Sequence, residues 1–122
     1  MFYIVGSTGL LSKLIQKILK NKKVVLISSK KKNNVLFSNV FSKKINENWI
    51  KKVNKNDTLI FLSNLGNINY YNNNKNKVEK FHTNILNNLF LKLDKNTRII
   101  FFSSDMVYSG KNKKKVYYDY SN

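Results

Sequence analysis

The stretch Phe2-Tyr3-Ile4-Val5-Gly6-Ser7-Thr8-Gly9-Leu10-Leu11-Ser12 decides how the rest of this chain is interpreted. Its first four residues form an apolar run typical of a buried strand, and apolar residues then recur at helical spacing up to Lys20. The two glycines between these segments predict a tight turn, so the order is strand, turn, helix. A turn of this kind leaves the first backbone N–H groups of the helix available to an anion such as a phosphate.

The small residues of this turn have separate predicted roles. Gly6 permits the sharp exit from the strand, and Gly9 lets the backbone approach a phosphate closely because it has no Cβ. Ser12 stands where dinucleotide-binding turns usually carry a third glycine, and it keeps a small side chain for helix–strand packing. We therefore expect a dinucleotide pyrophosphate to bind at Gly6, Ser7, Thr8, Gly9, Leu10 and Leu11. The alternative is an ordinary strand–turn–helix in which the glycines serve the turn alone.

The composition limits the classes of protein to consider. The chain has 122 residues, enough for one domain, and carries a formal net charge of +17. Such a charge is typical of nucleic-acid binders. However, Arg98 is the only arginine, and a lysine- and asparagine-rich chain without alanine or proline matches A/T-rich codons. We therefore interpret most of the charge as solvated surface that attracts nucleic acid only non-specifically, and keep a small basic nucleic-acid-binding protein as the alternative function.

Several kinds of site and location are disfavoured by what the sequence lacks. It contains no cysteine and one histidine, His82, which excludes thiolate and multi-histidine metal sites. No signal peptide and no run of about twenty apolar residues is present, so we expect a cytoplasmic protein without a membrane partner. His82 itself is expected to be a packed or exposed helix residue.

The helix after the glycine turn is amphipathic and basic. Such a helix could lie on a membrane surface, but the preceding strand needs an apolar cover. We therefore expect its apolar face to pack inward and its polar face to be solvated. The apolar face carries Leu10, Leu11, Leu14, Ile15 and Ile18, and the polar face carries Lys13, Gln16, Lys17 and Lys20.

The rest of the chain alternates apolar runs with helical or polar patterns. Strands are predicted at residues 24–27, 35–37, 59–62 and 98–102, a helix or helical turn at 45–53, a mobile loop at 67–77 and a helix at 78–93. Trp49 is expected in the core. The alternation predicts an α/β fold with a Rossmann-like parallel sheet of about five strands in the order 3-2-1-4-5. We expect residues 1–110 to form this domain and residues 111–122 to be a basic, tyrosine-rich tail.

Polar residues follow two of the predicted strands, at the ends where α/β sheets bind ligands. Ser28, Ser29 and Lys30 follow the second strand, where NAD sites usually carry an acidic residue for the ribose. Hydroxyls and lysines suit a 2′-phosphate better, so the cofactor is NAD or NADP, with NADP favoured. A solvated lysine run is the alternative. Ser63 and Asn64 follow the fourth strand and are expected at the same ligand-binding edge.

Four segments in order resemble an extended short-chain dehydrogenase/reductase, the family of nucleotide-sugar epimerases, dehydratases and reductases. Residues 6–11 resemble the glycine turn, and residues 57–64, with Leu62, Ser63 and Asn64, resemble the strand that passes the cofactor. Asn84 resembles a helix asparagine that supports the site, and residues 102–108 (Phe-Ser-Ser-Asp-Met-Val-Tyr) resemble a strand-end signature. The resemblance implies the NAD(P)-binding part of a nucleotide-sugar reductase or epimerase.

The same resemblance implies catalytic residues and a truncation. Ser104 would donate a hydrogen bond to the reacting oxygen, beside the cofactor-binding Ser103. Asp105 matches an acid of sugar dehydratases, whereas Met106 replaces their second acid, which favours a reductase or epimerase. The family's Tyr-x-x-x-Lys pair would lie beyond Asn122, so we expect a chain truncated before the catalytic helix and substrate lobe, and inactive alone. Expected partners are a complementing C-terminal chain, a nucleotide-sugar substrate once completed, or a second copy covering an open fifth strand.

Overall fold

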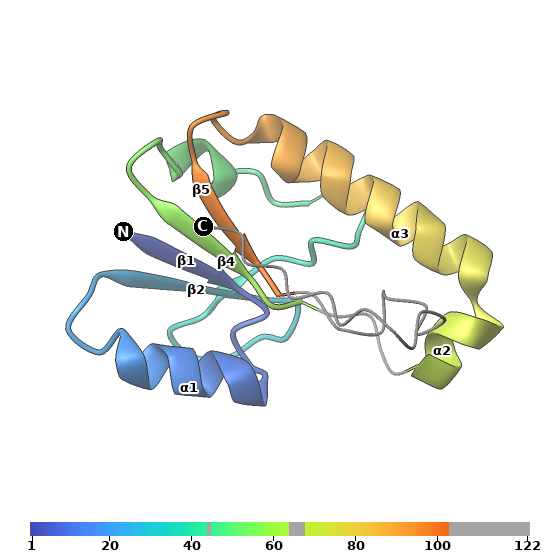
Figure 1. The fold of residues 1–122 in the computed structure, drawn as a ribbon, viewed down its shortest axis with the longest axis horizontal. Helices are drawn as coiled ribbons and strands as arrows, with labels where there is room; N and C mark the ends of the chain where they lie inside the picture. The colour runs from blue at the N-terminus through green and yellow to red at the C-terminus, as the bar shows by residue number, and fades with distance from the viewer. Residues whose placement is uncertain (44, 64–67, 103–122) are drawn as a thin grey trace, which may run out of the picture.

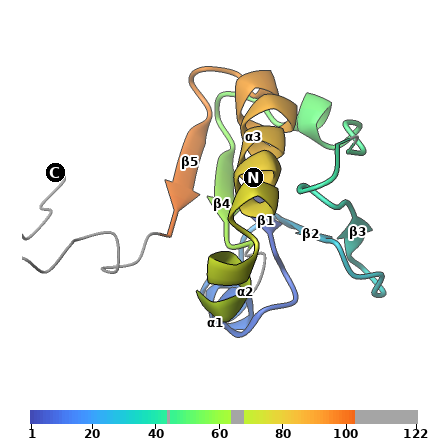
Figure 2. The same cartoon turned by 90° about the vertical axis from the view of Figure 1, so that its right-hand side faces the viewer.

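A five-stranded, all-parallel sheet forms the centre of the protein, with the strand order β3-β2-β1-β4-β5 (Figures 1 and 2). The computed structural model describes residues 1–43, 45–63 and 68–102. The strands are β1 (Phe2–Val5), β2 (Val24–Ser28), β3 (Leu36–Phe37), β4 (Thr58–Phe61) and β5 (Arg98–Phe101). The predicted Rossmann-like α/β fold and its strand order are therefore confirmed, whereas the expected tail at residues 111–122 lies outside the described residues.

Helices lie on both faces of this sheet. Helix α1 (Leu10–Ile18) lies on one face and α3 (Lys75–Asn88) on the other (Figures 1 and 2). The short helix α2 (Ile68–Asn73) and the 3₁₀ turn η2 (Phe90–Lys92) flank α3, and a second 3₁₀ turn, η1 (Ile50–Lys52), precedes β4. In the described ranges, no helix combines the length and apolar character that crossing a bilayer requires.

The strand register explains which side chains form the core. The ladders align β1 with β2 and with β4, so that alternate residues of the three strands share one face. On this face lie Tyr3, Val5, Val25, Ile27, Leu59 and Phe61. They pack against Trp49 from the segment before β4 and against Ile85 of α3. Trp49 is 1% exposed, and its Nε1–H donates to the buried Ser38 Oγ at 3.1 Å, which confirms it as a core residue.

Two segments differ from their predicted structure. The predicted mobile loop at residues 67–77 is wrong, because α2 occupies residues 68–73 and α3 begins at Lys75. Asn74 lies between the two helices, where its side chain donates to the Tyr70 carbonyl oxygen and its own carbonyl accepts the Val78 N–H, each at 2.9 Å. These local bonds stabilise a helical junction in a polar sequence. The segment 45–53 contains a single 3₁₀ turn, the shorter of the two predicted forms.

Helix α1 lies where the sequence predicts it, but its predicted inward face is wrong. Ser12 is 1% exposed, whereas Leu10 and Ile18 are 78% and 79% exposed. The Gln16 side-chain amide donates to the Ser7 carbonyl oxygen at 3.1 Å and to Ser12 Oγ at 2.9 Å. These bonds hold the small polar side of α1 against the glycine turn. The apolar residues that this orientation leaves exposed are Leu10, Leu11, Leu14 and Ile18.

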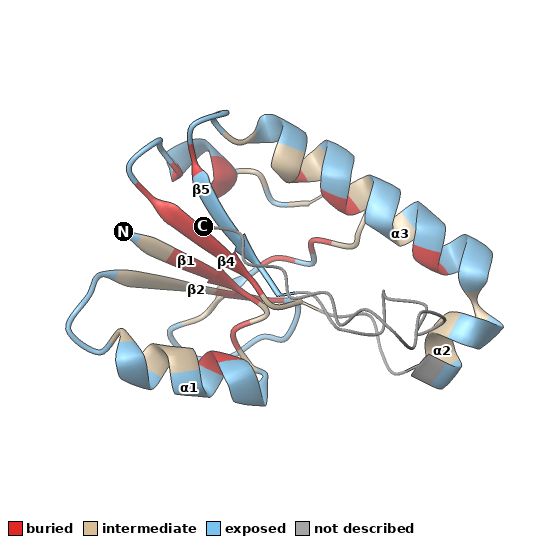
Figure 3. Ribbon diagram, viewed as in Figure 1, coloured by how far each residue is buried: buried red, intermediate tan, exposed pale blue. Residues whose placement is uncertain are grey.

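Strand β5 forms one edge of the sheet, as expected from the sequence, and its apolar residues are exposed (Figure 3). Ile99 and Phe101 share the face of Leu59 and Phe61, and Ile100 lies on the opposite face. These residues and Phe102 are between 40% and 61% exposed. Both faces of β5 therefore contribute apolar surface beside the well-buried β4.

Asp57 is buried at the edge of the sheet where the strands begin. Its carboxylate accepts hydrogen bonds from the Met1 ammonium at 2.9 Å and from the Asn54 N–H at 3.1 Å. The bond from the ammonium holds the pKa of Asp57 below its usual value, against the opposing effect of burial. This acid therefore has structural partners, and it lies at the opposite edge from the glycine turn.

Replacing Trp49 with alanine should lower the free energy of unfolding by about 3–5 kcal/mol, because it leaves a large cavity and an unpaired Ser38 hydroxyl. Urea denaturation followed by far-UV circular dichroism measures this change. Leu91→Ala, at a residue that is 69% exposed, serves as the control and should cost less than about 0.5 kcal/mol. Similar losses in both variants would contradict a core built around this ring.

Candidate functional site

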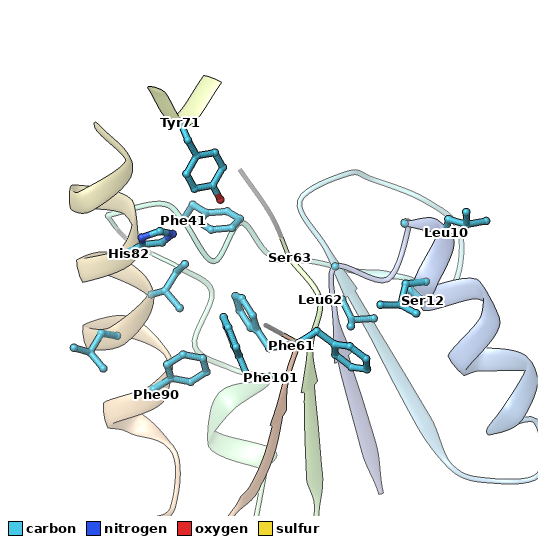
Figure 4. A pocket seen from close by; sticks show the side chains of 16 residues that line it. Leu10, Ser12, Phe41, Phe61, Leu62, Ser63, Tyr71, His82, Phe90 and Phe101 are labelled. Carbon is cyan, nitrogen blue, oxygen red and sulfur yellow. The ribbon is translucent and has the colours of Figure 1, made fainter. Parts of the chain in front are cut away.

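A cleft opens at the carboxyl ends of β1 and β4, between α1 and α3 (Figure 4). The chain passes from β1 to β2 and β3 on one side and returns to β4 on the other side of β1. Open α/β sheets bind ligands at such a switch point. The cleft has a volume of about 640 Å³, which is within the usual range for small-molecule sites.

The cleft has two parts. The glycine half lies beside α1 and is lined by Gly6, Gly9, Leu10, Leu11, Ser12, Leu62 and Ser63. The aromatic half lies between α3 and the ends of β4 and β5, and its lining includes Phe41, Phe61, Tyr71, His82, Leu86, Phe90 and Phe101 (Figure 4). Among the described residues, neither half is lined by a lysine, arginine, aspartate or glutamate.

Gly6 brings the ends of three strands together. Its φ of +88° lies in the region that favours glycine. A Cβ on Gly6 would lie 2.7 Å from the backbone nitrogen of Ser63, just after β4. The N–H groups of Gly6 and Ser7 both donate to the Ile27 carbonyl oxygen of β2, at 2.9 and 3.0 Å. Packing within the protein therefore requires glycine at this position.

Gly9 is not required by packing in the same way. It precedes α1 in an extended conformation, with φ −77° and ψ 167°, which any residue can adopt. A Cβ on Gly9 would have its nearest neighbour, the Gly6 carbonyl oxygen, at an ordinary 3.7 Å. Because Gly9 is exposed and borders the cleft, its missing side chain leaves open space beside the first N–H groups of α1. The first turn of α1 has no acidic residue to repel an anion there.

The hydroxyl groups around the turn differ in their hydrogen bonding. Ser7 Oγ is buried and has no hydrogen-bond partner in the described part of the chain, an arrangement that costs free energy unless a ligand or water pairs with it. The hydroxyls of Thr8 and Ser28 lie 3.3 Å apart and link the turn to β2, and Ser28 Oγ also accepts the Lys30 N–H at 3.0 Å. The exposed Ser29 and Lys30 remain as the groups that the end of β2 presents to solvent.

The structure brings part of the predicted site together. The predicted residues that border one cleft are Gly6, Gly9, Leu10, Leu11, Leu62 and Ser63. Asn84 lies on α3, and its side-chain amide donates to the Phe41 carbonyl oxygen at 3.3 Å, so it holds a segment that lines the aromatic half. The predicted residues Asn64, Ser103, Ser104 and Asp105 lie outside the described residues.

The aromatic half was not predicted from the sequence as a site. The positions of Phe61 and Phe101 at the ends of two strands are the signal that could have indicated it. Phe41 lies outside the helices and strands, in a segment without a periodic pattern, and Phe90 begins the 3₁₀ turn η2 that follows α3. His82, expected to be packed or exposed, is exposed on α3, and its ring lies 6.2 Å from that of Tyr71.

Gly6→Ala should lower the free energy of unfolding by about 2 kcal/mol or more, because the new Cβ would overlap the Ser63 backbone and the residue would keep a positive φ. Gly9→Ala is the matched variant, and its stability should stay within about 1 kcal/mol of the original chain. Urea denaturation of both variants measures the difference. Equal losses in the two would show that the turn does not have the described geometry.

Comparison of the chain with protein-family models, curated proteins and solved structures gives no match. Within residues 1–43, 45–63 and 68–102, no three histidine or acidic side chains are grouped closely enough to hold a metal ion. The function proposed below therefore rests on the fold, on the two halves of the cleft and on the sequence segments that resemble dinucleotide-binding proteins.

Proposed function

We propose that this chain is an NAD(P)-binding domain in which the glycine half of the cleft holds the pyrophosphate of the dinucleotide. The observation that carries the proposal is the contrast between its two glycines. Gly6 is required by contact with β4, whereas Gly9 borders the cleft and has free space around its Cα. A glycine without an internal packing role leaves its backbone accessible to a ligand, as a bound phosphate requires.

The other groups of the glycine half are compatible with this ligand. The first N–H groups of α1 have no carbonyl partner within the helix, and they favour negative charge. The Ser7 hydroxyl lies in the same turn, outside the described lining of the cleft, and is buried without a hydrogen-bond partner in the described part of the chain. No described carboxylate borders the cleft. When bound, NAD(P) supplies hydride-transfer chemistry, and the residues of the chain would bind and orient it.

The ribose end of the ligand would lie near the end of β2. Dinucleotide sites that select NAD usually place an acidic residue there. Ser29 and Lys30 follow β2 in this chain, and Lys30 offers a positive charge for a 2′-phosphate. We therefore propose NADP as the preferred form.

A finer proposal rests on the sequence resemblance alone. It assigns the chain to the extended short-chain dehydrogenases/reductases, with Ser104 as a hydrogen-bond donor to substrate, Asp105 beside it and Ser103 next to the cofactor. Asn84 would support the site through the segment that contains Phe41. The reaction proposed on this basis is that of a reductase or epimerase, in which a hydride moves between cofactor and substrate.

Gly9→Val should raise the Kd for NADPH about tenfold or more, because a branched side chain occupies the space next to the helix N-terminus. Titration of the fluorescence of NADPH, with circular dichroism to confirm folding, measures this change. Ile18→Ser is the control on the same helix, since Ile18 is 79% exposed and does not border the cleft. If Gly9→Val binds as tightly as the original chain and all binding falls steeply with salt, the ligand is adhering to surface lysines instead.

Lys30→Glu should change the choice between the two cofactors. A carboxylate there repels a 2′-phosphate and can accept hydrogen bonds from ribose hydroxyls, so the ratio of the Kd values for NADPH and NADH should rise about tenfold. Parallel titrations with the two nucleotides measure this ratio. An equal change with Lys95→Glu, on the exposed turn before β5, would show a general charge effect.

A further inference from the structure

The described side chains that border the aromatic half differ in charge from the rest of the protein. Charged residues make up 24% of the chain, yet none of the described residues that border the cleft is lysine, arginine, aspartate or glutamate. An ionic group entering this part would lose hydration without gaining an opposite charge. The described part of the lining therefore favours an uncharged ligand.

Phe61 contacts two other aromatic rings of this half. Phe61 is 3% exposed, and its ring packs edge-on against Phe90, with the centroids 5.5 Å apart. The Phe101 ring also stacks on that of Phe61, with the centroids 5.7 Å apart and the ring planes at 13°, yet Phe101 is 61% exposed. The buried Phe61 thus supports a neighbouring ring that remains open to the cleft, as Figure 4 shows.

Apolar surface from α3 borders the same space. Leu86 lies on α3 and is 49% exposed, although it borders the cleft together with Phe101. A flat apolar group inserted here would contact both the helix and the end of β5. Burying apolar surface of this kind favours binding.

We propose that the aromatic half binds a flat, uncharged, apolar group of a small-molecule ligand, such as an aromatic ring. This inference goes beyond the proposed function, because it concerns a different part of the cleft and holds whether or not a dinucleotide binds. It also departs from the sugar substrates that the sequence resemblance implies. Sugar hydroxyls require several hydrogen-bond partners, and the polar side chains described in this half are Tyr71 and His82.

The neutral fluorophore N-phenyl-1-naphthylamine is a suitable probe, because it has no charge that could attract it to the lysines. Titration of the full chain should give saturable binding with one site. Leu86→Asn and Phe101→Ser should each raise the Kd about tenfold, since each removes apolar contact with the ring. Leu86 is half-exposed on a helix, so Leu86→Asn keeps the test valid if Phe101→Ser fails to fold.

Ile18→Asn is the matched control, because Ile18 is an exposed apolar residue of α1 outside the cleft. It should leave the Kd of the probe unchanged, and a loss equal to that of Leu86→Asn would overturn the proposal by showing general adhesion. Gly9→Val should leave the Kd of the probe unchanged while it raises the Kd for NADPH about tenfold or more. This difference separates the inference from the proposed function. UDP-glucose should not displace the probe. If UDP-glucose does displace it, and Leu86→Asn weakens the binding of both compounds equally, the aromatic half would be a sugar-nucleotide site and the proposal would be wrong.

Discussion

The approach of Gly6 to the end of β4 is the constraint on which the cleft depends. In the turn after β1, two backbone N–H groups donate to the Ile27 carbonyl oxygen of β2, and Gly6 lies against the backbone of Ser63. Three strand ends are thereby held at one point, and α1 leaves this point with its first N–H groups beside the cleft. A Cβ at Gly6 would force these strand ends apart, so backbone geometry, more than any side chain, shapes the glycine half.

The sheet could be predicted because its signals are local. Short β-branched runs separated by helical or polar segments require parallel strands with crossovers, and right-handed crossovers limit the strand order. The side of α1 that packs inward could not be predicted from hydrophobic periodicity. The Gln16 side-chain amide donates to Ser12 Oγ and to the Ser7 carbonyl oxygen in the glycine turn, and these contacts override the apolar pattern. The same is true of α2, where Asn74 stabilises a junction that composition alone marks as a loop.

The two halves of the cleft differ in how far the sequence predicts them. The glycine half follows from a continuous stretch, residues 6–12, in which the positions of glycine and small residues directly constrain the backbone. The aromatic half combines Phe41, Phe61 and Phe101 from three separate segments with residues of α3. Nothing in the spacing of these residues relates one to another, and only the parallel register brings Phe61 and Phe101 side by side.

The distribution of charge explains why the net charge of +17 is a poor guide to what the cleft binds. A field from many surface lysines attracts any polyanion and is screened by salt beyond a distance of about 8 Å at physiological ionic strength. Selectivity must then come from short-range groups, and the described residues that border the cleft include glycines, serines, leucines and aromatic residues. A ligand with an anionic part and a separate apolar part would match both halves at once. The lysines would speed its encounter with the protein, whereas the proposed contacts at Gly9 and Phe101 would determine how long it stays bound.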